Sequence, residues 1–237
     1  MTGFKFDLKE LTIGDKKHTL TIEGIHFCLN SPERSIALLG DSGMGKTTIF
    51  RSLLSKYVQK WSLHSSFRFD CVHKLNDREF SAEDIQNDRR IVKIGFATQF
   101  PYFFESQTVF ENVFAPLKWK KLKLDRKNKE EYLKKFGLDT LTQKSISILS
   151  GGQRQLANIA RMLVVKPQLA IIDECFSSMD EKMAYEKIKF ILDYFNDIIF
   201  LVTSHRQSDV EAFGGKVIRL KKEQHRSGKF YVTQEDA

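Results

Sequence analysis

A glycine-rich segment between an apolar run and a helical pattern constrains this chain more than any other feature. The apolar residues 35–39 lead into a match to G-x-x-x-x-G-K-[ST], formed by Gly40, Asp41, Ser42, Gly43, Met44, Gly45, Lys46 and Thr47, with Thr48 next. Glycines are needed where backbone N–H groups turn inward around a phosphate, often at positive φ, and the following helix N-terminus also faces the anion. We predict that this loop binds nucleotide phosphates, with Lys46 on the β- and γ-phosphates and the Thr47 hydroxyl on Mg²⁺.

Two carboxylates follow a second apolar run. Residues 169–172 lead directly into Asp173 and Glu174. Ligands collect at the carboxyl ends of strands in open α/β sheets, so we expect Asp173 to hold Mg²⁺ and Glu174 to orient and deprotonate a water molecule. Acids after a strand also serve as N-caps of the next helix, so this interpretation depends on the phosphate loop upstream.

Strand and helix patterns alternate along most of the chain. Strand patterns lie within residues 4–38, 67–72, 91–97, 169–172 and 198–203. Helix patterns lie within residues 46–57, 109–149, 156–164 and 184–195. Apolar strands separated by amphipathic helices are typical of a parallel sheet with crossover helices, which predicts an α/β fold.

A short serine-glycine motif distinguishes among the many families that have phosphate loops. Leu149, Ser150, Gly151, Gly152 and Gln153 form the sequence LSGGQ. A serine and two glycines at the start of a helix make a second anion site of N–H groups and a hydroxyl. The motif resembles the signature of ATP-binding cassette (ABC) ATPases. That resemblance implies a homodimer that binds ATP together with Mg²⁺. In it, Ser150, Gly151, Gly152 and Gln153 of one subunit cap the γ-phosphate of ATP bound to the other.

Further positions resemble the same family, in the same order. Gln99 is similar to the Q-loop glutamine that touches Mg²⁺ and the attacking water, and Asp180 lies in a segment similar to the D-loop at the dimer interface. His205 is similar to the switch histidine that contacts the γ-phosphate. The resemblance therefore implies an ATPase in which Glu174, His205, Gln99 and Lys46 are catalytic.

The resemblance spans about residues 4–220 and implies an organisation for the whole chain. We expect a single domain over 1–237, with a P-loop NTPase core and its mostly parallel sheet in 1–105 and 160–237. The core includes an N-terminal antiparallel β subdomain, and residues 106–159 form an inserted helical subdomain that carries the signature.

Three positions depart from the family pattern. The loop at residues 14–18, where the family usually has an aromatic residue that stacks on adenine, holds no Tyr or Phe, only His18. Residues 32–34 read Pro-Glu-Arg where the family usually has Gly-Glu, and Cys175 stands where Pro commonly follows the catalytic glutamate. None of these removes a group that phosphoryl chemistry needs.

The partners follow from the resemblance and from the lack of a long apolar segment. The longest apolar runs are far shorter than the ~20 residues that cross a bilayer, so we expect a separate transmembrane permease and a cytoplasmic location on the inner face of the cell membrane. The aromatic-rich residues 100–104 resemble the region that receives a helix of that permease, although ordinary packing explains them equally well.

Charge gives an alternative function. The net charge is +8, and much of it lies in residues 118–129. Such a run attracts nucleic acid or anionic lipid, or is a solvated helix face. The alternative is thus a soluble ABC ATPase acting on nucleic acid or ribosomes, but we expect no nucleic-acid partner because coiled coils, zinc modules and a second cassette are not visible. The three widely spaced cysteines indicate core thiols in a reducing compartment.

Overall fold

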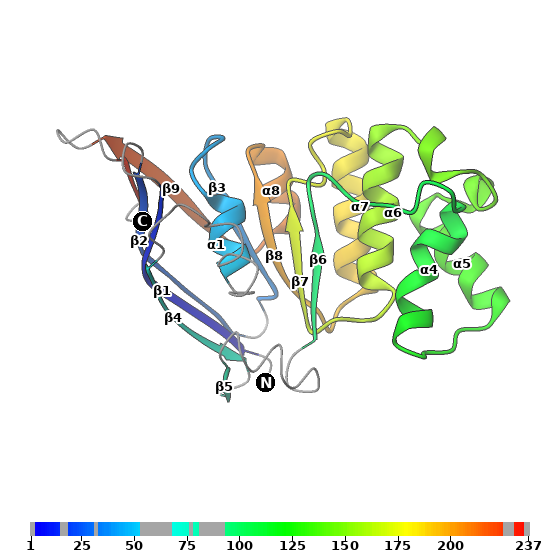
Figure 1. Cartoon of the computed structure of the whole chain (residues 1–237), viewed down its shortest axis with the longest axis horizontal. Coiled ribbons are helices and arrows are strands. Elements are labelled where there is room, and N and C mark those ends of the chain that lie inside the picture. The colour runs from blue at the N-terminus through cyan, green and yellow to red at the C-terminus, as the bar shows by residue number, and fades with distance from the viewer. Residues whose placement is uncertain are drawn as a thin grey trace. The chain divides into compact units, whose positions relative to one another are not determined.

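The computed structural model describes residues 3–14, 19–30, 33–52, 68–75, 78–80, 93–224 and 230–234. The chain divides into two compact units, the first formed by Met1–Lys93 with Ile199–Ala237 and the second by Ile94–Ile198 (Figure 1). The predicted helical subdomain, residues 106–159, falls inside the second unit, and its boundaries stay a prediction.

The first unit contains a layer of mainly antiparallel strands. They are β1 (Gly3–Gly14), β2 (Thr19–Asn30), β4 (Arg68–Leu75), β5 (Arg78–Phe80) and β10 (Phe230–Gln234). β1 pairs antiparallel with both β2 and β4, and Ile22 and Ile25 of β2 are fully buried. β10 runs parallel to β2, so the antiparallel region predicted at the N-terminus also takes in a strand from residues 230–234.

The same unit contains a parallel set of strands beside this layer. Its elements are β3 (Ser35–Leu39), α1 (Lys46–Ser52), β8 (Ile199–Ser204), α8 (Gln207–Phe213) and β9 (Lys216–Gln224). β3 lies between β8 and β9 and is parallel to both, and β9 joins the first layer through its antiparallel pairing with β10. The predicted helix 46–57 is described as far as Ser52; residues 53–57 lie outside the described residues.

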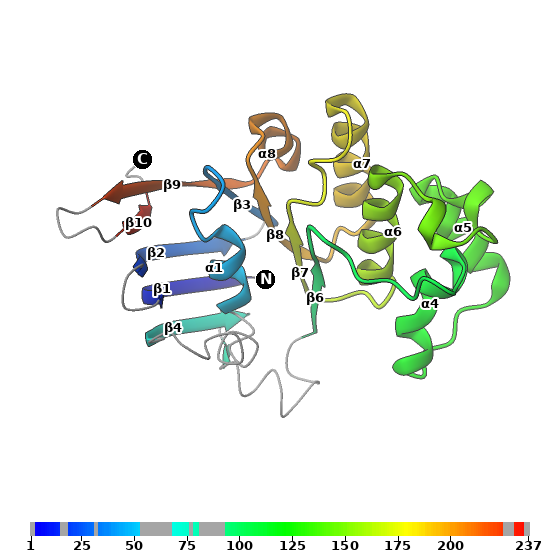
Figure 2. The same ribbon diagram turned by 45° about the horizontal axis from the view of Figure 1, so that its top comes forward.

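Two parallel strands and a group of helices form the second unit. The strands β6 (Ile94–Ala97) and β7 (Leu169–Asp173) pair in parallel. The helices are α4 (Val109–Trp119), α5 (Arg126–Phe136), α6 (Gly151–Leu163) and α7 (Glu181–Tyr194), with 3-10 turns η1 (Asp139–Leu141) and η2 (Ile146–Ile148). Figures 1 and 2 show α6 between α7 on one side and α4 and α5 on the other.

Local capping residues begin and end these helices. Thr108 and Glu111 form a capping box at the start of α4, because each side chain bonds the other residue's backbone N–H. The Asp125 side chain accepts from Asn128 N at the start of α5. Gly137 ends α5 in the left-handed conformation at φ 73°, where a Cβ would be strained.

An aromatic cluster forms the core between the helices of the second unit. Phe114, Tyr132, Phe136 and Phe195 contact one another, with ring centroids 5.1–6.4 Å apart. The buried Tyr132 hydroxyl donates to Ala160 O at 2.8 Å, which satisfies the one polar atom in this side chain. The parallel pairs in both units, linked through helices, confirm the predicted α/β class with a mostly parallel sheet.

Candidate functional site

The predicted phosphate loop connects β3 to α1 in the first unit. Gly43 and Gly45 have φ values of 80° and 77°, which only glycine adopts without strain. A Cβ at position 40 would lie 2.8 Å from Met44 Sδ and 3.2 Å from Leu220 Cβ, so a side chain there would be crowded and glycine fits best. The loop therefore has the backbone conformation that its motif predicts.

Lys46 lies inside this loop rather than in solvent. Its side chain is 4% exposed, and Nζ donates to the backbone oxygens of Gly40 at 2.6 Å and Asp41 at 3.0 Å. The loop thus holds an ammonium group against its own backbone. Thr47 and Thr48 follow in the first turn of α1, half-buried.

His205 follows β8 in the same unit, and a buried carboxylate fixes its two neighbours. Asp209 is 3% exposed and accepts from Ser204 Oγ at 2.8 Å. It also pairs with Arg206, whose Nη2 and Nε lie 2.7 and 3.1 Å from the two carboxylate oxygens. Arg206 N in turn donates to Ser204 Oγ at 3.0 Å. The backbone on both sides of the exposed His205 is therefore held in place.

Two of the predicted catalytic residues meet in the second unit. Gln99 follows β6, Glu174 follows the parallel strand β7, and Gln99 Nε2 donates to Glu174 Oε2 at 3.0 Å. Asp173, the last residue of β7, is buried at 2% exposure. The carboxyl ends of the two strands thus present an amide and two carboxylates.

Glu174 has a strained backbone. Its φ is 50°, in the left-handed region that non-glycine residues rarely adopt. Ser177 holds the Glu174 carbonyl through Oγ at 2.8 Å and through its backbone N–H at 3.4 Å. Cys175 is fully buried next to it, and this burial raises the pKa of the thiol. Strain of this kind concentrates at functional sites.

The predicted signature motif forms the first turn of α6. Ser150 is the N-cap: its Oγ accepts from Gln153 N at 3.3 Å, and Gln153 Oε1 accepts from Ser150 N at 3.1 Å. A Cβ on Gly152 would come within 3.3 Å of Met179 Cγ, so the motif lies tightly against the segment before α7. Asp180 in that segment is the N-cap of α7, accepting from Met183 N at 2.9 Å.

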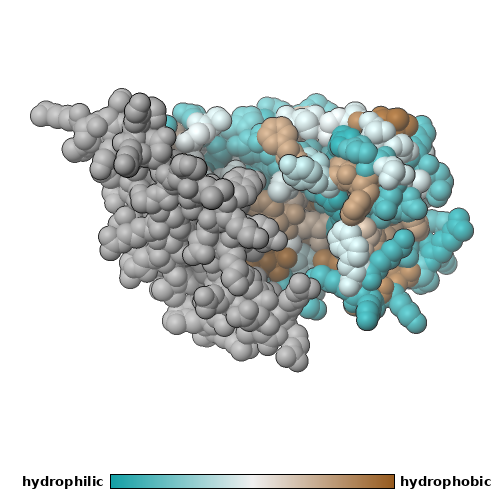
Figure 3. All heavy atoms as spheres, viewed as in Figure 1, coloured by the Kyte–Doolittle hydropathy of each residue, from teal (hydrophilic) through white to brown (hydrophobic). Residues whose placement is uncertain are grey.

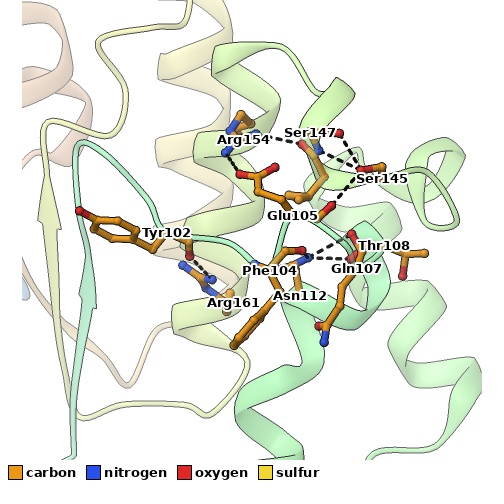
Figure 4. A network of polar contacts seen from close by, with 11 residues as sticks. Tyr102, Phe104, Glu105, Gln107, Thr108, Asn112, Ser145, Ser147, Arg154 and Arg161 are labelled. Carbon is orange, nitrogen blue, oxygen red and sulfur yellow. Dashed lines mark hydrogen bonds and ion pairs between the residues drawn. The ribbon is translucent and has the colours of Figure 1, made fainter.

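The segment between Gln99 and α4 is anchored by three side chains (Figure 4). The fully buried Asn112 donates from Nδ2 to Phe104 O and Thr108 O, both at 3.0 Å, and its Oδ1 accepts from Phe104 N at 2.9 Å. Arg161 donates to Tyr102 O at 2.6 Å, and Arg154 pairs with Glu105 at 2.8 Å. The backbone of this aromatic segment is therefore held by defined hydrogen bonds, although many of its aromatic rings are exposed.

The predicted site residues are divided between the two units. Gly40–Thr48 and His205 belong to the first, whereas Gln99, Ser150–Gln153, Asp173–Glu174 and Asp180 belong to the second. The Gln99–Glu174 contact and the Ser150–Gln153 capping box are formed within the second unit. Among the described residues, no group of three or more His, Cys, Asp or Glu side chains gathers as a ready metal site. The predicted adenine position at residues 15–18 and the departure at Pro32 lie outside the described residues.

Sequence reasoning missed several polar residues that support the site. They are Asn112, Gln155, Asn158 and Asp209, all buried. Gln155 and Asn158 lie outside the apolar stripe predicted for α6, at residues 156, 159, 160, 163 and 164, so that pattern gave no signal of their burial.

The basic run spans the end of α4 and the start of α5. Lys129 lies over the Phe110 and Phe114 rings, 5.7 and 5.5 Å from their centroids, and Arg126 pairs with Glu130 at 2.9 Å. Part of this charge is therefore used locally. Within the described ranges, no helix combines the length and apolar character that a membrane span requires.

Comparisons with known proteins agree with the motifs. A family model described as ABC transporter matches residues 22–177. The chain is 31% identical over 178 residues to the lipoprotein-releasing system ATP-binding protein LolD of Ehrlichia canis (strain Jake), a match covering 72% of this chain and 75% of that protein. It is 33% identical over 165 residues to the L-cystine import ATP-binding protein TcyC of Bacillus subtilis (strain 168), covering 68% of this chain and 65% of that protein.

A solved structure supports the fold. The structure of cbiO1 from Clostridium perfringens, part of the ABC transporter complex cbiONQ, superposes with a TM-score of 0.67 at 23% identity, over 96% of this chain and 86% of that chain. Since the family model covers most of the chain and the match to LolD exceeds 30% identity over three quarters of that protein, this chain belongs to the ABC transporter family, among its ATP-binding proteins.

Proposed function

We propose that this chain is the ATP-hydrolysing subunit that powers a separate transmembrane permease through ATP-driven closure and opening of a homodimer. The observation that carries the proposal is the 3.0 Å contact between Gln99 Nε2 and Glu174 Oε2, directly after two parallel strands. A carboxylate placed there and oriented by an amide suits the activation of a water molecule.

ATP and Mg²⁺ fit the residues that are present. The positive-φ glycines 43 and 45 and the enclosed Lys46 suit a triphosphate, which would bind along the loop Gly40–Thr48. The Thr47 hydroxyl, the Asp173 carboxylate and the Gln99 amide oxygen are the hard oxygen donors that Mg²⁺ prefers. Mg²⁺, when bound, neutralises charge that develops on the phosphate oxygens.

Hydrolysis assigns a separate role to each catalytic group. Glu174 takes the proton of the attacking water, whose oxygen forms a bond to the γ-phosphorus while the bond from phosphorus to the leaving oxygen of ADP breaks. Gln99 orients the carboxylate and the water, and His205 contacts the γ-phosphate. Lys46 stabilises the negative charge on the phosphates.

The signature turn supplies the reason for a dimer. The Ser150–Gln153 turn presents N–H groups at the start of the 13-residue helix α6. One chain needs a single phosphate cradle for one ATP, so this second turn would cap ATP held by the loop of another copy. Asp180 would lie at the same interface.

The aromatic segment after Gln99 is the proposed contact with the permease. Phe100 and Tyr102 are 77% and 91% exposed, while the Phe103 ring lies 4.4 Å from the Arg161 guanidinium and 5.2 Å from that of Arg154. Figure 3 shows hydrophobic side chains interspersed with hydrophilic ones on the helical unit. Exposed rings on an anchored loop suit a partner protein. The chain would then be peripheral on the membrane through its permease.

The alternative of an ATPase acting on nucleic acid is not favoured. The relatives described above are named as ATP-binding proteins of a lipoprotein-releasing system and of L-cystine import. Lipoproteins and L-cystine are named for those relatives, and neither is proposed as the cargo of this chain.

A Glu174→Gln variant tests the proposal. It should bind ATP with the wild-type affinity, but turnover should fall by about 10²- to 10⁴-fold, because general-base catalysis typically contributes that much. With ATP and Mg²⁺ it should accumulate as a dimer in light scattering. Glu181→Gln, an exposed acid in the first turn of α7, is the matched control and should keep wild-type turnover. Wild-type turnover in Glu174→Gln would remove Glu174 from its role, and a strictly monomeric ATP-loaded variant would contradict the shared site.

The permease is tested by detergent pull-down. Wild-type protein should copurify with an integral membrane protein, and a Phe100→Ser/Tyr102→Ser variant should lose it while it keeps ATP binding. Retention of the membrane partner by that variant would contradict the assignment of the aromatic segment.

A further inference from the structure

Two buried amides on α6 have no place in the mechanism above. Gln155 is 7% exposed and Asn158 is 3% exposed, and the two are three residues apart on the helix that Ser150 begins. Burying an amide is unfavourable unless it makes hydrogen bonds, so the partners of these side chains reveal what their positions require.

Both amides hold the backbone where the chain leaves β6. Gln155 Nε2 donates to Gln99 O, and Asn158 Nδ2 donates to Thr98 O at 3.0 Å. Asn158 Nδ2 also lies 3.4 Å from Gln155 Oε1, which links the two side chains to each other. Two successive carbonyls, one of them belonging to Gln99 itself, are thereby fixed to α6.

One of these amides, Asn158, also reaches the residues at the end of β7. The Cys175 thiol donates to Thr98 O and to Asp173 O, both at 3.5 Å, and Asn158 Nδ2 lies 3.9 Å from Cys175 Sγ. Thr98 O is therefore shared between Asn158 and Cys175. Thr98, which precedes Gln99, and Asp173 and Cys175, on either side of Glu174, are thus linked through Asn158 and the thiol, and Gln99 Nε2 donates to Glu174 Oε2 at 3.0 Å.

We propose that Asn158 and Gln155 are positioning residues for hydrolysis, which act by placing Gln99 on the Glu174 carboxylate. The inference rests on the proposed function, because it takes Gln99 and Glu174 to act in the chemical step. Glu174 has a φ of 50°, so its backbone conformation depends on surrounding contacts. The thiol at position 175 extends those contacts, since it donates to Thr98 O, directly after β6, and to Asp173 O, at the end of β7.

The test is a double-mutant cycle between Asn158 and Gln99. Asn158→Leu keeps the branching and the number of heavy atoms of the side chain and removes the donor to Thr98 O. We expect kcat to fall by about 10- to 100-fold, since small misplacements of catalytic groups have effects of that size, while the Kd for ATP changes less than about twofold. In a Gln99→Ala background, Asn158→Leu should cause little further loss, because its effect passes through Gln99.

Two further variants keep the test decisive. Gln155→Glu removes the donor to Gln99 O with little change of shape, and it should lower kcat in the same way if Asn158→Leu does not fold. Asn196→Leu, an exposed amide after α7, is the matched control and should leave kcat unchanged.

The outcomes separate this inference from the proposed function. Unchanged kcat in folded Asn158→Leu or in Gln155→Glu, or an equal loss of kcat with and without the Gln99 side chain, would overturn the positioning role and leave the ATPase assignment intact. A wild-type protein that binds ATP without hydrolysing it would instead overturn the proposed function, and the positioning role with it.

Discussion

Asn112 gives the sharpest test of how the aromatic segment is held. Asn112→Leu keeps the branching of this fully buried side chain and removes its bonds to the N–H and C=O of Phe104, at 2.9 and 3.0 Å. A polar group that loses its partner in the interior costs about 1–3 kcal/mol. Phe104 O keeps its bond from Gln107 N at 2.9 Å, so Phe104 N–H is the group left without a partner, and the middle of that range applies to it. We therefore expect the free energy of opening this segment to fall by about 2 kcal/mol.

Amide hydrogen exchange measures that change at one position. A loss of about 2 kcal/mol corresponds to roughly 30-fold faster exchange of the Phe104 amide, while amides in β7 keep their rates. Asn128→Leu is the matched control, because its side chain bonds only the exposed Asp125, and surface changes usually stay within about 0.5 kcal/mol. A change of less than about threefold at Phe104, or an equal change in the control, would refute the anchoring role of Asn112.

Three other predictions test the loop, the thiol and the carboxylate after β8. Gly43→Ala should weaken ATP binding about tenfold, because a side chain at φ 80° costs about 1–2 kcal/mol even though a Cβ there meets no atom within 4 Å; unchanged affinity in calorimetry would contradict this. Cys175, in a variant whose other cysteines are serine, should resist thiol reagents at pH 8 until urea is added, because burial raises the pKa of its thiol and keeps it protonated; rapid labelling of folded protein would be the opposite result. Asp209→Ala should lower the free energy of unfolding by about 2–3 kcal/mol. This is less than for a fully buried pair, because the Arg206 side chain is 16% exposed. An unchanged midpoint in urea titration would contradict this prediction.

The sequence predicts well those parts of the protein whose backbone conformation requires particular residues at neighbouring positions. The glycines at 43 and 45 are required by positive φ, and the apolar stripe after Ser150 corresponds to α6. Asp173 and Glu174 were placed at the end of a strand because the apolar run stops there. In each case a few neighbouring residues carry the whole signal.

The parts that were missed depend on contacts between distant segments. The parallel pairing of β10 with β2 joins residues about 210 positions apart, and no local pattern encodes such a register. Asn158 bonds a carbonyl 60 residues away, and Asn112 bonds the chain that precedes its own helix. An apolar periodicity predicts which face of a helix is buried, but it does not predict which distant carbonyl a polar side chain on that helix will bond.

Glu174 shows why these distant contacts matter. A non-glycine residue at φ 50° costs about 1–3 kcal/mol, and glycine would adopt this conformation without that cost. The carboxylate is nevertheless present. Its side chain and the following thiol are bonded to the segment after β6, through Gln99 and Thr98, and its backbone carbonyl is bonded to Ser177. A residue that stability alone would replace by glycine is thus kept and held by several hydrogen bonds. Such an arrangement is expected at a functional site, where a fixed orientation of the Glu174 carboxylate outweighs the cost of its strained backbone.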